Sequence, residues 1–171
     1  VHRDLKPGNI LVSKEGVPVL LDFGIGKLLE AETEAEGSRT RTGMQAFTPE
    51  YAAPEQLRRE PVGVATDVYG PGLLLYRILT GRRPFDPSSG FEYEKAVLEK
   101  EPTRPSVHGG RALAGDLDTI VLKALKKEPG ERYASAAAFA DDLDRYLQGD
   151  PVLAQPDSIG YRLRKLASKH R

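Results

Sequence analysis

The sequence has no cysteine and no tryptophan, and only one methionine among its 171 residues. The absence of cysteine excludes disulfides and thiolate metal sites, and it fits a reducing compartment. No apolar run approaches the roughly 18 residues that a membrane-spanning helix needs, and no signal peptide opens the chain. We therefore expect a cytoplasmic chain, whose parent protein would be membrane-anchored only through a segment outside these residues.

An excess of charge of either sign is also missing. Lys plus Arg and Asp plus Glu both total 25, so the formal net charge is zero. Such a balance gives no overall attraction to nucleic acid, and no nucleic-acid partner is expected. The length suits one domain with a sizeable core. Because the chain starts at Val1 and its methionine is Met44, we expect a piece of a longer protein.

Residues with catalytic chemistry gather at the start of the chain, in the runs HRDLKPGN (2–9) and DFG (22–24). Asp4 can accept a proton, Lys6 can neutralise a phosphate, and Asn9 and Asp22 offer hard oxygens to Mg²⁺. The apolar runs 10–12 and 17–21 predict two short strands around a Lys-Glu-Gly turn. A hairpin of this kind would bring Asn9 and Asp22 to the same end, where one metal ion could meet both.

These runs resemble the catalytic loop and the D-F-G motif of protein kinases, in the right order. The resemblance continues through Ala53-Pro54-Glu55, Asp67 and Arg132 and covers residues 1–148. It is to the C-terminal lobe of eukaryote-like bacterial serine/threonine protein kinases. It implies a mainly α-helical, kinase-like C-lobe with a small β-hairpin at the catalytic loop and with the N-lobe absent.

The resemblance implies phosphoryl transfer from ATP, with Mg²⁺, to a Ser or Thr hydroxyl of a protein substrate. Asp4 would orient the hydroxyl and take its proton, and Lys6 would steady the γ-phosphate. Asn9 and Asp22 would hold Mg²⁺. Thr48 would lie in the substrate loop, where its hydroxyl can bridge Asp4 and Lys6, and it indicates Ser/Thr rather than Tyr substrates.

The polar, non-periodic run 30–43 has the composition of a mobile surface loop. The resemblance implies the activation segment, with Thr40 and Thr42 as the preferred phosphate acceptors. Arg3, directly before Asp4, could pair with a phosphate there. A solvated connector without a regulatory role is the alternative.

A helix that begins at Asp67 and ends before Gly81 is apolar nearly all round, which predicts a buried central helix. The resemblance implies that Asp67 accepts N–H bonds from the catalytic-loop backbone, with a plain N-cap as the alternative. Pro71 lies inside this helix and is expected to disturb it, at a cost of about 3 kcal/mol. The resemblance also implies that Arg132 pairs with Glu55, whereas the alternative is a surface arginine.

Periodicity predicts three more amphipathic helices, over residues 91–100, 117–125 with Asp116 as cap, and 135–147 with Phe139, Leu143, Tyr146 and Leu147 on one face. Residues 102–110 are expected to form a loop, with His108 facing solvent. Residues 149–171 predict a linker and then a basic helix, a segment distinct from 1–148. Its positive charge is compatible with membrane contact.

The 171 residues contain no G-x-G-x-x-G loop and no V-A-I-K lysine to anchor ATP. We expect both to belong to an N-lobe that precedes Val1 and acts in cis, so that this chain alone is inactive. Two alternatives stay open. The chain could be a non-catalytic kinase remnant that binds a protein partner, or a basic-tailed interaction module at membranes. The intact Asp4, Lys6, Asn9 and Asp22 favour an enzyme.

Overall fold

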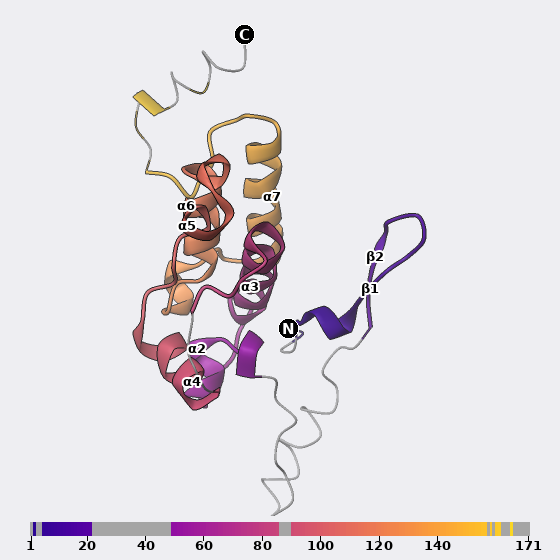
Figure 1. Ribbon diagram of the computed structural model, residues 1–171, viewed down its shortest axis with the longest axis vertical. Coiled ribbons are helices and arrows are strands. Elements are labelled where there is room, and N and C mark those ends of the chain that lie inside the picture. The colour runs from indigo at the N-terminus through magenta and orange to yellow at the C-terminus, as the bar shows by residue number, and fades with distance from the viewer. Residues whose placement is uncertain are drawn as a thin grey trace, which may run out of the picture.

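The computed structural model of the protein describes residue 2 and residues 5–21, 49–85, 90–156, 158, 160, 161 and 165. In this part of the chain the fold is mainly α-helical, with one small two-stranded sheet. Figure 1 shows the longer helices packed side by side, with the hairpin projecting near the N-terminus. None of the described helices is long and apolar enough to cross a membrane.

The predicted hairpin is present. Strand β1 (Ile10–Val12) follows the 3₁₀ turn η1 (Pro7–Asn9) and pairs antiparallel with β2 (Pro18–Leu20). Gly16 makes the tight connection with a φ of 81°, which a residue without Cβ adopts without strain. Both strands expose apolar side chains, and Val12 is 66% exposed.

The central helix α3 (Thr66–Thr80) ends where the sequence predicts, at Gly81 in the left-handed conformation. It is continuous through Pro71, so the expected disturbance does not interrupt it. Burial is less complete than predicted, because Tyr69 and Tyr76 are fully buried whereas Ile78 is 70% exposed. The reason is that the packed elements cover only part of the helix surface.

The glycines on either side of Pro71 allow two close approaches to α3. A Cβ at Gly70 would lie 2.9 Å from the carbonyl oxygen of Leu5, in the segment that follows Asp4. A Cβ at Gly72 would lie 2.9 Å from the Cβ of Ala124. Both distances are shorter than real Cβ contacts, so the two glycines let the backbone at Leu5 and the helix that contains Ala124 pack directly on α3.

Two groups of elements pack around α3. At one end lie the 3₁₀ turn η3 (Pro49–Tyr51) and the helices α2 (Pro54–Leu57) and α4 (Gly90–Glu99). The helices α6 (Asp116–Ala124) and α7 (Ala136–Leu147) extend along its other part (Figure 1). Short 3₁₀ turns η4 (Arg111–Leu113) and η5 (Pro129–Glu131) precede these two helices. The helices predicted from Asp67 to Gly81 and over residues 91–100, 117–125 and 135–147 are therefore confirmed to within about two residues at each end. Most of the predicted basic helix near the end of the chain lies outside the described residues.

Three local predictions are wrong. The expected loop contains a short helix, α5 (Pro105–Gly109), whose Ser106 donates backbone and hydroxyl hydrogen bonds to Asp118 at 2.8 and 2.6 Å. His108 is half-buried and packs edge-on against Tyr76, at 6.5 Å between ring centroids. The third concerns α6, which is preceded by Gly115 with a φ of 101°, so Asp116 is its first residue and not its cap.

Helix α7 begins with the hydroxyl of Ser135 accepting a bond from the Ala138 amide at 3.1 Å. Leu147 was predicted on its apolar face but is 77% exposed, since it lies in the last turn beyond the packed surface. The residues that follow this helix pack back against the helical core. Val152 is 3% exposed, and the buried carboxylate of Asp142 accepts bonds from the amides of Leu153 and Ala154.

Candidate functional site

The structure describes five of the side chains predicted to form or support the site: Lys6, Asn9, Glu55, Asp67 and Arg132. The remaining predicted residues lie outside the described residues: Arg3, Asp4, Asp22, Thr40, Thr42 and Thr48. The described elements that flank these positions in the chain therefore define the candidate site.

One end of the hairpin joins Asn9, a predicted Mg²⁺ ligand, to Leu21 by a backbone hydrogen bond. Asn9 is half-buried at the end of η1, and its main-chain N–H donates to the carbonyl of Lys6 at 2.9 Å. The amide of Leu21 donates to the carbonyl of Asn9, also at 2.9 Å. Leu21 directly precedes the second predicted ligand, Asp22, which lies outside the described residues.

Helix α3 holds the backbone on both sides of Asp4. The main-chain N–H of His2 donates to Oδ2 of Asp67 at 2.7 Å, and His2 is buried. Leu5 lies against Gly70, one turn further along the same helix. The described residues on either side of positions 3 and 4 therefore both contact α3, His2 through a hydrogen bond and Leu5 through close packing.

Arg132 and Glu55 form a buried ion pair across 77 positions of sequence, as predicted. Nη1 and Nη2 of Arg132 each donate to one carboxylate oxygen of Glu55 at 2.7 Å, a bidentate geometry. The other donors of the guanidinium reach the carbonyls of Ala65, Lys126 and Lys127. All five N–H groups are thus used, and the arginine links α2, the start of α3 and the segment after α6.

The carboxylate of Glu55 is 1% exposed and also accepts a bond from the Thr66 hydroxyl at 2.8 Å. Burial alone would raise its pKa, but the hydrogen bonds and charge of Arg132 outweigh burial, so the pKa of Glu55 is lowered. The pair is therefore charged at neutral pH. It fixes α2, the helix that follows the predicted substrate loop.

Tyr69 lies under this ion pair, with its ring 5.0 Å from the guanidinium carbon of Arg132. Its buried hydroxyl has no hydrogen-bond partner among the described residues. We expect Tyr69→Phe to leave the free energy of unfolding unchanged or to raise it by up to about 1 kcal/mol, because a buried donor without a partner is unfavourable. Urea unfolding measures the change.

Tyr133→Phe is the matched control, because the Tyr133 hydroxyl donates to the buried Asp142 carboxylate at 2.8 Å. That change should lower the free energy of unfolding by about 1–3 kcal/mol. Equal losses in the two variants would contradict the assignment of Tyr69 as unpartnered.

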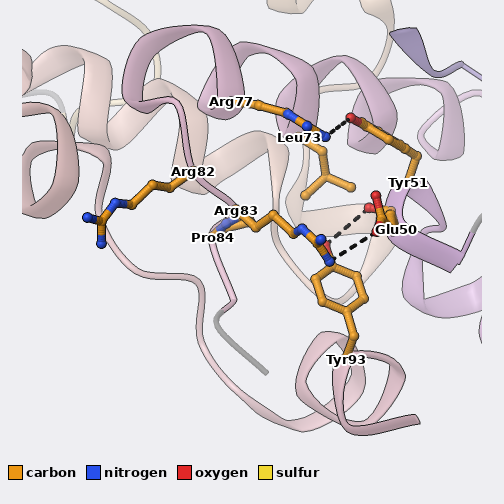
Figure 2. A pocket seen from close by; sticks show the side chains of 8 residues that line it. All are labelled: Glu50, Tyr51, Leu73, Arg77, Arg82, Arg83, Pro84 and Tyr93. Carbon is orange, nitrogen blue, oxygen red and sulfur yellow. Dashed lines mark hydrogen bonds and ion pairs between the residues drawn. The ribbon is translucent and has the colours of Figure 1, made fainter. Parts of the chain in front are cut away.

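The turn η3, directly after Thr48, borders a hollow that the sequence did not indicate. Figure 2 shows Glu50 and Tyr51 from η3, Arg77 and Leu73 from α3, and Tyr93 from α4 around it. The lining also includes Arg82 and Arg83. In the sequence, nothing distinguishes these arginines or Arg77 from ordinary surface residues, so the hollow was not predicted.

The donor chemistry of the predicted metal pair fits Mg²⁺, which prefers amide and carboxylate oxygens. Of the two predicted ligands, the structure describes Asn9, at the end of η1, whereas Asp22 lies outside the described residues. Within the described ranges, no three His, Asp or Glu side chains gather into a metal-binding group elsewhere.

A family model for the protein kinase domain matches residues 1–143, and the chain belongs to this family. A probable serine/threonine-protein kinase of Corynebacterium efficiens is 38% identical over 147 residues, which cover 84% of this chain and 22% of that protein. The serine/threonine-protein kinase PknB of Mycobacterium tuberculosis is 39% identical over 152 residues, which cover 88% of this chain and 24% of that protein. The serine/threonine-protein kinase PksC of Streptomyces coelicolor is 41% identical over 142 residues, which cover 83% of this chain and 25% of that protein. The chain thus spans about a quarter of the length of these relatives, all of which are bacterial kinases.

Proposed function

We propose that this chain is the large, C-terminal lobe of a serine/threonine protein kinase. In the full protein it would transfer the γ-phosphoryl group of ATP to Ser or Thr hydroxyls of protein substrates. The observation that carries the proposal is the attachment of the catalytic-loop backbone to α3. Asp67 holds His2, and Gly70 admits Leu5, so the backbone on both sides of Asp4 is fixed.

Each catalytic side chain then has a separate role. Asp4 accepts the proton of the substrate hydroxyl, and Lys6 places a positive charge beside the transferred group. Asn9 and Asp22 supply oxygen ligands for the cation at the end of the hairpin. Bound ATP with Mg²⁺ supplies the phosphoryl group and neutralises the charge that develops on it.

The substrate side rests on residues that follow in the chain. Thr48 precedes η3 and would contact Asp4 and Lys6 through its hydroxyl. Thr40 and Thr42 would be phosphorylated in the activation segment, and Arg3 would pair with the added phosphate.

The phosphate-covering loop and the ATP-anchoring lysine do not occur in these 171 residues, and we propose that a small lobe of the same protein provides them. The hairpin supports this, because it exposes apolar side chains that a neighbouring lobe would cover: Leu11 by 56%, Val12 by 66% and Leu21 by 44%. The 171 residues alone should therefore show no useful turnover, since most of the catalysis comes from positioning the nucleotide.

The proposal is tested by transfer of label from γ-labelled ATP to a protein substrate, catalysed by the natural full-length protein. Label should appear on Ser and Thr, and removal of Mg²⁺ with a chelator should abolish its incorporation. Label on Tyr alone would contradict the substrate class. Absence of transfer, combined with retained binding of a protein partner, would favour the non-catalytic remnant instead.

A further inference from the structure

The hollow beside η3 carries an inference about which substrates the protein prefers. It lies between η3, the C-terminal half of α3 and helix α4, and it begins two residues after Thr48 (Figure 2). Its volume is about 220 Å³, counted with its open side. Because this space is open to solvent, the hollow is a shallow surface site, suited to contact with one side chain of a larger ligand and not to enclosing a small molecule.

Two arginines point into this hollow from different walls. Nη1 of Arg77 donates to the Tyr51 hydroxyl at 2.8 Å, and Nη1 of Arg83 lies 3.1 Å from Oε1 of Glu50. Figure 2 shows both guanidinium groups directed toward η3, whereas the side chain of Arg82 points away. These contacts use only part of the five donors on each guanidinium, and both side chains are accessible to solvent.

The two guanidinium groups are held in place before any ligand arrives. The guanidinium carbon of Arg83 sits 5.6 Å from the centre of the Tyr93 ring, a cation–π distance. The Tyr93 hydroxyl donates to the Glu50 carbonyl at 3.1 Å, which ties the ring to η3. Arg77 is restrained by Tyr51. A pre-positioned arginine loses less conformational entropy when it binds an anion.

We propose that this hollow binds an acidic side chain of the protein substrate, namely Asp, Glu or a phosphorylated Ser or Thr. The inference rests on the proposed function and deepens it by naming a substrate preference. Two positive charges face one negative charge, that of Glu50, so the site attracts anions. Arginine pairs bind carboxylate and phosphate through planar, bidentate hydrogen bonds.

Glu50 acts as an internal competitor in this arrangement. Its carboxylate, 38% exposed, occupies one edge of the Arg83 guanidinium in the absence of substrate. An incoming acidic side chain either displaces it or uses the donors of Arg77 and the free edge of Arg83. Glu50→Gln should therefore strengthen the binding of acidic peptides, the opposite of what loss of an arginine does.

The test uses the natural full-length protein and a set of peptides with one acceptor Ser in an alanine background. A single Glu is moved from three residues before the Ser to three residues after it, and each peptide has a Gln-containing partner. We expect one or two positions at which Glu lowers KM about threefold to tenfold relative to Gln, with kcat unchanged. Fluorescence anisotropy of the same labelled peptides measures binding independently of turnover.

Arg77→Gln and Arg83→Gln should each bring the ratio of KM between the Gln and Glu peptides close to one; this ratio, and not the absolute KM, is the readout. Arg145→Gln, an exposed arginine on α7 at the other end of the fold, is the control for a general change of charge. Equal affinity for Glu and Gln peptides at every position would overturn the proposal. A preference for Glu that survives both arginine changes, or weaker binding in Glu50→Gln, would overturn it as well. Absence of phosphoryl transfer with the binding preference intact would contradict the proposed function alone.

Discussion

Replacement of Arg132 by alanine is expected to lower the free energy of unfolding by about 3–5 kcal/mol. The change leaves the Glu55 carboxylate buried without its bidentate partner, and it removes the hydrogen bonds to three backbone carbonyls. Since ordinary domains are stable by only about 5–15 kcal/mol, such a loss would leave much of the protein unfolded. Urea unfolding of the natural full-length protein measures it.

A double-mutant cycle separates the ion pair from the other bonds of Arg132. Glu55→Ala should also be severe, and the double variant should be little worse than either single one. Additive losses would show that the two side chains do not interact. Arg58→Ala is the matched control, because Arg58 lies 3.6 Å from an exposed Glu128 and such pairs contribute about 0–1 kcal/mol.

The same pair makes stability depend on pH in a defined direction. The pKa of Glu55 is lowered in the folded protein from its ordinary value of 4.5. The stabilisation is therefore present above pH 4.5 and is lost as the pH falls through the lower, folded-state pKa. In Arg132→Ala the carboxylate loses its partner and burial raises its pKa, so the difference between variant and wild type should shrink on acidification.

Replacement of Asp67 by alanine is expected to lower kcat about 100-fold, because displacement of a reacting group by 1 Å can cost that much. The Asp67 carboxylate accepts a hydrogen bond from the main-chain N–H of His2 at 2.7 Å, and under the proposed function this bond would position Asp4, two residues further along. The KM for ATP should change little, since no nucleotide contact is proposed for this residue. Asp67→Asn keeps an acceptor oxygen and should retain more activity.

Steady-state kinetics on a Ser-containing peptide measures both constants for each variant. Asp141→Ala, an exposed position on α7, is the control for loss of a carboxylate and should match the wild type. An unchanged kcat in Asp67→Ala would contradict a positioning role and would leave Asp67 as an ordinary residue of the first helical turn.

The structural elements that could be predicted from the sequence are those specified by residues close together in the chain. The hairpin follows from two apolar runs around a glycine turn, and the end of α3 follows from Gly81. The pair of Glu55 with Arg132 spans 77 positions and has no local signal. It was predicted only because the surrounding motifs resemble those of a family.

The features that sequence reasoning missed depend on contacts between distant segments. Helix α5 has five residues and is held by bonds from Ser106 to Asp118, so its own periodicity is too short to detect. In the sequence, Gly70 and Gly72 would be expected only to weaken the helix. The structure shows that they make room for Leu5 and Ala124, which pack closely against them.

The replacement of Asp4 by asparagine tests the central claim most directly. In the natural full-length protein, the account predicts that Asp4→Asn lowers kcat for a Ser-containing peptide by about 10²–10⁴-fold, because the proton acceptor is lost. Nucleotide binding and the free energy of unfolding should stay close to those of the wild type. Phosphoryl transfer at the wild-type rate by Asp4→Asn would contradict the account.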